Sequence, residues 1–371
     1  AIKAAQHMKA AADQGCVEAE FQYGMMLHEG NGVPQDNKQA NVYLTLAANE
    51  NHHSAQFHLA QLYINQSSSI EDPSQRTEKL KNAAFYMKAS ADNGNSQAQY
   101  LFSKMLSQSY GVEKNEAKSN EYLAKAADNP NPYLDALIEF AKLKIHNNEI
   151  EKAKLYLEKA IETSDNPEPF YLFGKLLLEN KNKKKSDIQK AIGFLKRAAD
   201  QEYAAAENLY GVCLVDGIGV KKNAKEAAIY FEKAANSKLP EGLFNHGLEL
   251  YKKYLNDKKK KKRAPSPKSL KNLPLSHSMS LPHFPDIDDT FSSLLRNALS
   301  YIEEAANSSL IEAADYLAPL ISDSAIAQAE KYYRLAACNG AGIPHAKYEL
   351  GNMYIDGNGV VPNKQKAKKY I

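Results

Sequence analysis

The first residues in the chain whose types and spacing suit a chemical role are two glycines in the segment LHEGNGVPQD, residues 27–36. Gly30 and Gly32 stand one residue apart, and the backbone N–H groups of such a pair can bind a phosphate. A dinucleotide site needs a third glycine where Gln35 stands, and a P-loop needs a Lys-Ser or Lys-Thr pair, which the segment lacks. The residues before Gly30 have apolar side chains at helical spacing. The segment therefore predicts a turn, in which Gly30 ends one helix with a left-handed backbone and Asp36 caps the next.

Histidines offer a second candidate chemistry, because imidazole is the commonest metal ligand. Of the ten histidines, only His52, His53 and His58 are clustered, and the last two stand five residues apart, which places them on different faces of a helix. No cysteine or pair of carboxylates joins them, so we expect no metal site. The sequence signatures of serine hydrolases, zinc proteases and kinases are missing as well. The sequence therefore indicates a protein that is not an enzyme and has no cofactor and no small-molecule substrate.

The glycine phrase recurs, which indicates a structural joint in place of a site. It returns at residues 217–220 and 357–360, and in a degenerate form at 110–112. A pair of small residues also closes each repeat, and successive pairs lie about 36 residues apart, with one gap of 71. A fixed period of this length predicts stacked two-helix repeats. The closing pairs begin at Ala11, Ala47, Ser90, Ala126, Ala160, Ala198, Ala234, Ala305 and Ala336.

Each repeat has small and aromatic residues at the same places. In the first full repeat, Ala19, Tyr23 and Gly24 belong to the first helix, and Ala40 and Tyr43 belong to the second. Neither helix can bury its apolar stripe alone, so neighbouring repeats must stack. We therefore expect an all-α, right-handed α-solenoid of antiparallel helix pairs. It should have a half repeat at the start, eight full pairs and an incomplete pair at the end.

These residues resemble a known family. The pattern A-x-x-x-L/Y-G-x-x-L/Y-x-x-G-x-G-V, followed by A-x-x-Y-x-x-x-A-A, is similar to the Sel-1-like repeat, a relative of the tetratricopeptide repeat. The match is strongest at residues 19–48, 206–235 and 346–370, whereas the repeat at 136–160 has no glycine loop and is closer to a plain tetratricopeptide unit. The resemblance implies a superhelical scaffold or adaptor that binds other proteins.

A basic insertion interrupts the array. We expect residues 1–255 to form a half repeat at 1–15 and about six helix pairs, residues 256–290 to be a disordered insertion in the seventh repeat, and residues 291–371 to complete the array. Residues 252–271 carry a net charge of +9, against +3 for the whole chain, so the remainder is net negative. The run from Lys258 to Arg263 could serve as a nuclear import signal or bind acidic membrane or nucleic acid, with Ser266 as a phosphorylation site. The alternative is a solvated lysine run without a function.

The resemblance also indicates where a partner would bind, because first helices line the concave face of the tetratricopeptide fold. The corresponding positions hold one row of large apolar residues and one of lysines. The alternative is that the aromatic side chains form the core between repeats and that the lysines form a solvated face. The repeat that begins at Ala313 has no aromatic residue at these positions, and Pro319 should break or bend its first helix. The groove residues are Phe21, Met25, Phe57, Gln61, Tyr100, Lys104, Ile138, Lys142, Tyr171, Lys175, Phe244 and Tyr348.

Three functions remain after these observations. The leading hypothesis is a non-enzymatic adaptor that binds extended or acidic peptide segments, or domains, of other proteins on its concave face. The second is the regulatory or targeting segment of a larger protein, such as a kinase or a ubiquitin-ligase or quality-control component. The third is nucleic-acid binding through the lysine-rich insertion, which we do not expect because the helices lack basic stripes interleaved with aromatic residues.

The ends of the chain and its cysteines bear on its context. The chain begins at Ala1 and ends at Ile371, each within the second helix of a repeat, so we expect it to be a segment of a longer protein. Cys16, Cys213 and Cys338 lie far apart, which favours a reducing, cytoplasmic compartment. No apolar run reaches the length of a membrane span, so we expect no membrane partner.

Overall fold

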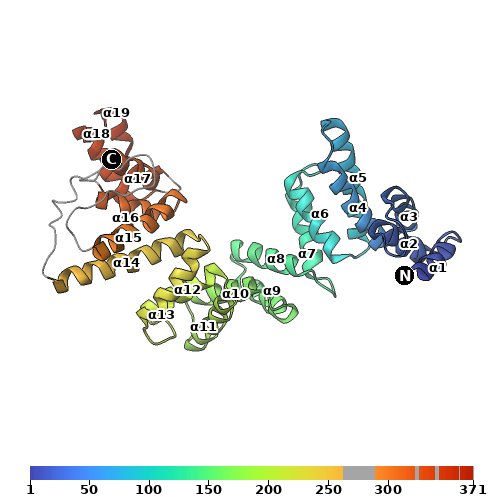
Figure 1. The fold of residues 1–371 in the computed structure, drawn as a ribbon, viewed down its shortest axis with the longest axis horizontal. Helices are drawn as coiled ribbons and strands as arrows, with labels where there is room; N and C mark the ends of the chain where they lie inside the picture. Colours follow the sequence, from blue (N-terminus) through green and yellow to red (C-terminus); the bar gives the residue numbers. More distant parts are fainter. Residues whose placement is uncertain (262–288, 322–325, 339–341, 359, 371) are drawn as a thin grey trace. The chain divides into compact units, whose positions relative to one another are not determined.

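The computed structural model describes residues 1–261, 289–321, 326–338, 342–358 and 360–370. Within these ranges the chain forms nineteen α-helices and no strand, which confirms the predicted all-α class. The helices belong to two compact units, an N-terminal unit of Ala1–Asp165 and a C-terminal unit of Asn166–Ile371 (Figure 1).

Helices follow one another as antiparallel pairs. The N-terminal unit contains α1 (Ile2–Ala12), α2 (Val17–Glu29), α3 (Asn37–Asn49), α4 (His53–Ser68), α5 (Pro73–Asp92), α6 (Ser96–Gln108), α7 (Glu116–Ala127), α8 (Leu134–His146) and α9 (Ile150–Thr163). The C-terminal unit contains α10 (Pro167–Glu179), α11 (Lys185–Asp200), α12 (Ala204–Asp216), α13 (Ala224–Asn236), α14 (Pro240–Lys261), α15 (Asp289–Asn307), α16 (Ile311–Ile321), α17 (Ile326–Cys338), α18 (Pro344–Asp356) and α19 (Lys364–Tyr370).

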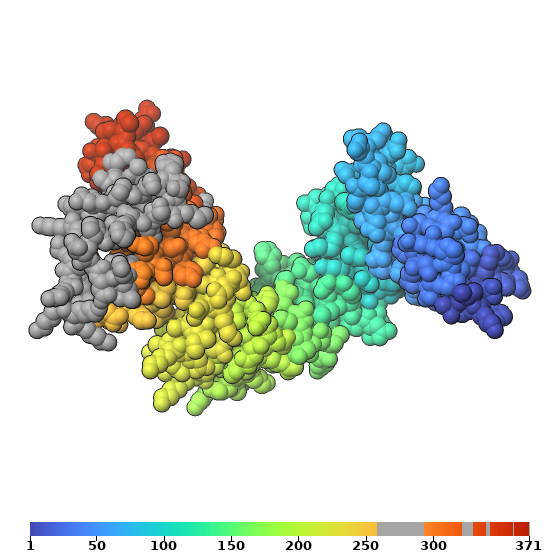
Figure 2. Space-filling view, in the orientation of Figure 1, coloured from blue at the N-terminus to red at the C-terminus, as the bar shows by residue number. Residues whose placement is uncertain are grey.

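The arrangement of pairs agrees with the predicted repeat count. Helix α1 is a lone second helix, α2 to α17 make eight full pairs, and in the last pair α19 has only seven residues. Within each unit, every helix contacts the next one along the chain. The colours in the space-filling view accordingly follow the sequence from one pair to its neighbour (Figure 2). The solenoid architecture inferred from the 36-residue period is therefore confirmed.

The glycine phrase forms a turn between the two helices of a pair. Gly30 ends α2 with φ 73°, and its N–H donates to the carbonyl of Met26. The Asp36 side chain then accepts hydrogen bonds from the N–H groups of Lys38 and Gln39, at 2.9 and 3.0 Å, and so caps α3. Gly217 and Gly357 end α12 and α18 in the same left-handed conformation. The predicted turn is confirmed in all three places.

Glycine also allows the two helices of a pair to approach closely. A Cβ atom added to Gly24 would lie 2.9 Å from Cγ of Leu44, and one added to Gly211 would lie 2.7 Å from Cε1 of Phe231. Both distances are shorter than a van der Waals contact, so α2 packs against α3, and α12 against α13, only because a side chain is missing. Next to this contact, an aromatic ring of the first helix meets a tyrosine of the second edge-on. The pairs, with centroids 4.8–5.0 Å apart, are Tyr23–Tyr43, Phe102–Tyr122, Phe140–Tyr156 and Tyr210–Tyr230.

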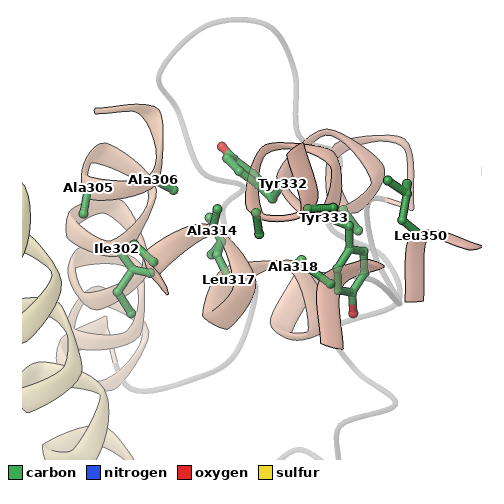
Figure 3. Packing of buried hydrophobic residues seen from close by; sticks show 14 of the residues in the cluster. Ile302, Ala305, Ala306, Ala314, Leu317, Ala318, Tyr332, Tyr333 and Leu350 are labelled. Carbon is green, nitrogen blue, oxygen red and sulfur yellow. The ribbon is translucent and has the colours of Figure 1, made fainter. Parts of the chain in front are cut away.

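Apolar side chains of several pairs join into one core in the C-terminal unit. Ile302 of α15, Leu317 of α16 and Tyr332 of α17 are buried in a single cluster, and alanines fill the narrow spaces between the helices (Figure 3). Leu350 of α18 extends the same cluster into the last pair. Each pair therefore contributes to a core that its neighbours complete, as stacking of two-helix repeats requires.

A hydrogen bond from tyrosine to a carboxylate connects consecutive pairs. In each case a tyrosine of one second helix donates its hydroxyl to an acidic residue of the preceding second helix, or to the residue that ends it. The distances are 2.6–2.9 Å, which is typical of a hydroxyl bound to a carboxylate. The bonds are Tyr43–Asp13, Tyr122–Asp92, Tyr156–Asp128 and Tyr332–Glu303.

The chain is helical at two places where the sequence predicts irregular structure, the start of the insertion and Pro319. Helix α14 continues to Lys261, so the first six residues of the expected insertion are helical, while residues 262–288 lie outside the described residues. Helix α16 contains Pro319 and continues to Ile321, so a break at this proline is wrong, while the bend given as its alternative stays a prediction. Pro319 lies within the last turn of α16, where a proline removes a single N–H donor and little helix remains to be disrupted.

Candidate partner-binding surface

We use the term first-helix face for the surface that the first helices of the pairs present in each unit. In the N-terminal unit these helices are α2, α4, α6 and α8, and in the C-terminal unit they are α10, α12, α14, α16 and α18. First helices also contact each other directly, as α6 does α8 and α12 does α14. Neighbouring pairs therefore contact each other through their first helices, and the predicted groove residues lie on these helices.

Phe21 lies in a group of histidines between α2 and α4. Its ring stacks on His52 with centroids 4.7 Å apart, and the centroid of His58 is 5.7 Å away. His52 occupies the N-cap of α4, where its Nδ1 accepts a hydrogen bond from the N–H of Ala55. The neutral ring then carries its proton on Nε2 and donates to Glu18, 3.1 Å away. His52 and His58 thus serve ring packing around Phe21, and His52 also caps α4.

A small cavity opens beside this group. It has a volume of about 60 Å³ and is lined by Met25, His28, His58, Gln61 and Asn65, with Leu44 and Leu62 as apolar walls. His28 pairs its Nδ1 with Oδ1 of Asn37 at 2.8 Å. Burial, and secondarily the charge of His28, lower the pKa of the His58 imidazole. The structure therefore brings together the predicted residues Met25 and Gln61 with two imidazoles that the groove residue set omits.

Tyr100 and Lys104 form a second group on the same face. The centroid of the Tyr133 ring lies 5.3 Å from that of Tyr100, and Nζ of Lys104 lies 5.9 Å from the Tyr100 centroid. Burial raises the pKa of Tyr100, and the negative charges of Glu139 and Asp135 raise it further. Tyr100 is therefore close to carboxylates as well as to the predicted lysines Lys104 and Lys142.

The three predicted lysines have different surroundings. Nζ of Lys142 lies 3.0 Å from Oε1 of Glu139, and Nζ of Lys175 lies 3.8 Å from Oε1 of Glu179. Lys104 makes no ion pair with any residue that the structure describes and rests on Tyr100. Lys104 and Lys142 belong to the N-terminal unit and Lys175 to the C-terminal unit, so the continuous row of three stays a prediction.

The large apolar residues of the predicted row divide into core and surface. Phe57 and Ile138 are 7% and 3% exposed, so both belong to the core, which agrees with the alternative that this row packs between repeats. Phe21, Tyr100, Tyr171 and Phe244 are half-buried, and Tyr348 is exposed.

The C-terminal unit contains an aromatic group in which two tyrosines outside the predicted groove set join the predicted residue Phe244. The ring of Tyr316 on α16 lies 5.8 Å from that of Phe244 and 6.4 Å from that of Tyr251, both on α14. Tyr316 follows the groove position at Asp315 by one residue, and Asp315 pairs with His345 at 3.1 Å. This repeat, which has no aromatic residue at the groove positions themselves, thus has one at the next residue. Tyr251 was detectable, because it has the same offset from Gly247 as His28 has from Gly24.

Among the described residues, no group of three or more His, Cys, Asp or Glu side chains is arranged to hold a metal ion. Burial raises the pKa of the Cys213 thiol to about 11, whereas Cys16 and Cys338 are exposed. In the part of the chain that the structure covers, no helix combines the length and apolar character that crossing a membrane requires.

Comparison with known proteins agrees with the geometry. A protective antigen of uropathogenic Escherichia coli with an SLR fold is similar in structure, with a TM-score of 0.59 and 18% identity over 99% of this chain and 78% of that one. A Sel1 repeat protein from Oxalobacter formigenes gives a TM-score of 0.53 and 21% identity over 98% of this chain and 84% of that one. No curated protein matches the sequence.

The family itself is evident in the sequence. Sel1 repeats match residues 1–16, 17–52, 53–95, 96–131, 171–203, 204–238, 323–340 and 344–371. Residues 132–170 are not matched, in agreement with the missing glycine loop of that repeat. Because the matched segments cover well over half of the chain, the protein belongs to the Sel1 repeat family.

Proposed function

We propose that the protein is a non-catalytic scaffold that binds segments of other proteins on the first-helix face of its N-terminal unit. Helical repeat proteins of this kind generally bind other proteins. The observation that carries the proposal is the group of half-buried aromatic and polar side chains on this face, around Phe21 and the cavity beside it and around Tyr100. Rigid aromatic rings beside polar groups are typical anchors in protein interfaces.

The chemistry of this surface favours an extended partner segment with apolar and acidic side chains. The rings of Phe21 and Tyr100 provide apolar contact, and Gln61 and Asn65 provide amide groups at the cavity. The Lys104 ammonium forms no ion pair among the described residues, so it has charge to offer a partner carboxylate. Lys142 contributes less, because Glu139 already offsets its charge.

The test is a comparison of two charge reversals that match in local setting. Lys104→Glu changes a lysine that rests on a tyrosine of the first-helix face. Lys79→Glu changes a lysine of α5, a second helix, whose Nζ lies 5.0 Å from the centroid of the Tyr63 ring. We expect Lys104→Glu to lower the affinity of the array for the proteins that the wild type captures by about tenfold. Lys79→Glu should leave this affinity unchanged. Circular dichroism confirms that both variants keep their helix content.

The result that would contradict the proposal is equal binding by both variants. In that case the partner binds elsewhere, on the second helices or on the insertion. A loss of binding in Lys79→Glu alone would assign the partner to the second helices.

A further inference from the structure

One buried polar position recurs in four of the first helices. It follows a small residue of the repeat pattern, namely Ala19, Ala55, Ala98 or Ala206. Two repeats have glutamine there and two have glutamate. All four side chains are buried: Glu20 is 7% exposed, Gln56 3%, Gln99 7% and Glu207 1%.

The two glutamines show what this position requires. Nε2 of Gln56 donates to the carbonyl of Ala48, eight residues earlier, at 3.0 Å. Nε2 of Gln99 donates to the carbonyl of Ala91, also eight residues earlier and at 3.0 Å. Each bond connects a first helix to the end of the preceding second helix, which belongs to the neighbouring repeat. The position therefore needs a hydrogen-bond donor directed at a backbone carbonyl.

An ionised glutamate has no donor to offer at this position. The same offset of eight residues assigns the carbonyl of Ala12 to Glu20 and that of Ala199 to Glu207. Oε2 of Glu20 and Oε2 of Glu207 are buried and have no hydrogen-bond partner among the described residues. A buried carboxylate without a partner is costly, and opposite a carbonyl it would place two acceptors against each other. A carboxylic acid, by contrast, has one O–H donor and nearly the shape of the glutamine amide.

The charged groups around the two glutamates do not offset an ionised carboxylate well. Burial, and secondarily the charge of Glu50, raise the pKa of Glu20. Asp13 and Tyr43 line the same hollow as Glu20, but Asp13 is bound to Lys9 and to Tyr43.

Glu207 has one cation nearby. Burial raises the pKa of its carboxyl, Lys233 lowers it by a smaller effect, and Glu202 raises it again. Lys233 also rests on the ring of Tyr230, with Nζ 5.8 Å from the centroid.

We propose that Glu20 and Glu207 are neutral carboxylic acids at neutral pH. The O–H group of each then donates a hydrogen bond to the alanine carbonyl of the preceding repeat. The contacts of α2 with α1 and of α12 with α11 then depend on pH, while the glutamine repeats do not. An unfolded glutamate ionises near pH 4.5, whereas the folded acid keeps its proton to a higher pH. The stability that these acids contribute is complete below pH 4.5 and declines as pH rises towards the folded pKa.

The first test uses the full chain with Glu20→Gln and Glu207→Gln together, and Gln56→Glu as the reverse variant. We expect the double glutamine variant to have a higher thermal midpoint than wild type at about pH 7, with the difference vanishing as pH falls to about 4.5. Gln56→Glu should lower the midpoint at about pH 7 and approach wild type at low pH. Equal midpoints of all three proteins across this range, or a lower midpoint of the glutamine variant at neutral pH, would overturn the proposal.

The second test detects the proton itself and does not depend on stability. Infrared spectra of protein with ¹³C-labelled glutamate should show a carboxylic-acid C=O band in wild type at neutral pH, which disappears in the double glutamine variant. If wild type has no such band, the two carboxyls are ionised and the proposal is wrong, whatever the midpoints show.

Discussion

Replacing one glycine of the α10–α11 pair should have the opposite effect on stability from replacing the other. Gly174 lies in α10, where an added Cβ would meet Cγ of Leu195 at 2.7 Å and the carbonyl oxygen of Ala191 at 3.0 Å. Gly193 lies in α11, where an added Cβ would have no atom within 4 Å. Both residues are helical, so alanine improves the helix propensity equally at both, by about 1 kcal/mol.

The change in the free energy of unfolding expected for Gly174→Ala follows from the backbone oxygen of Ala191, which the added Cβ would contact. Leu195 could rotate, but the Ala191 carbonyl belongs to α11 itself, so α10 and α11 would have to separate. Overpacking of this kind costs about 3 kcal/mol at the upper end of its usual range. Subtracting the gain in propensity, we expect Gly174→Ala to lower the free energy of unfolding by about 2 kcal/mol and Gly193→Ala to raise it by about 1 kcal/mol.

Hydrogen exchange is the appropriate assay, because a long repeat array need not unfold in one step. Mass spectrometry of peptides from residues 167–200 reports the opening of this pair directly. A difference of about 3 kcal/mol between the two variants corresponds to more than a hundredfold difference in exchange rate. If Gly174→Ala exchanged as slowly as wild type, the close approach of α10 and α11 would not depend on the missing side chain.

Two further predictions concern single side chains. Tyr122→Phe should lower the free energy of unfolding by about 1 kcal/mol at neutral pH, because it removes the hydroxyl bound to the partly exposed Asp92. Burial alone would raise the Asp92 pKa, but the bonds from Lys88 and Tyr122 lower it below 3.8. This stabilisation should therefore be complete above pH 3.8 and be lost as pH falls further. Urea titrations of both proteins at several pH values measure the difference in their free energy of unfolding, which would not change with pH if the bond contributes nothing. Iodoacetamide at neutral pH should label the exposed Cys16 and Cys338 while Cys213, with its pKa of about 11, reacts only after unfolding; rapid labelling of all three thiols in the native protein would contradict the burial of α12.

The repeat architecture could be predicted from the sequence because one set of residues carries it. Gly30, Gly217 and Gly357 mark helix ends by their backbone conformation, and the pairs of small residues that close the repeats give the period. Ser109 shows the limit of this signal, since it takes the left-handed conformation of Gly30 with φ 57° although it is not a glycine. The helices remain predictable there because the apolar pattern continues without the glycine.

The surface was less predictable, because spacing gives a position on a helix but not its neighbours. Phe57 and Tyr100 occupy equivalent places, yet Phe57 is buried and Tyr100 is half-buried against Tyr133, a residue that begins the next repeat's first helix. Glu139, three residues before Lys142 on the same helix, likewise offsets the positive charge of Lys142. The recurrence of lysine at one position in successive repeats gives no sign of this carboxylate. The tyrosine-to-carboxylate bonds between second helices cannot be predicted in this way, because no spacing within one helix relates their members.

These differences indicate how one scaffold supports different surfaces. The positions that hold pairs together, such as Gly24 opposite Leu44, have room for small residues only, and the equivalent places in other repeats hold Ser103, Ala141, Gly174 and Gly211. The neighbouring positions on the first-helix face are less closely packed, because they hold side chains such as Phe21 and Tyr100 that are only half-buried. The array therefore separates the residues that set its geometry from those that meet a partner. Binding preference in this protein should accordingly depend on a few half-buried residues, among them Phe21, His58 and Tyr100, which contact other rings or a lysine on this face.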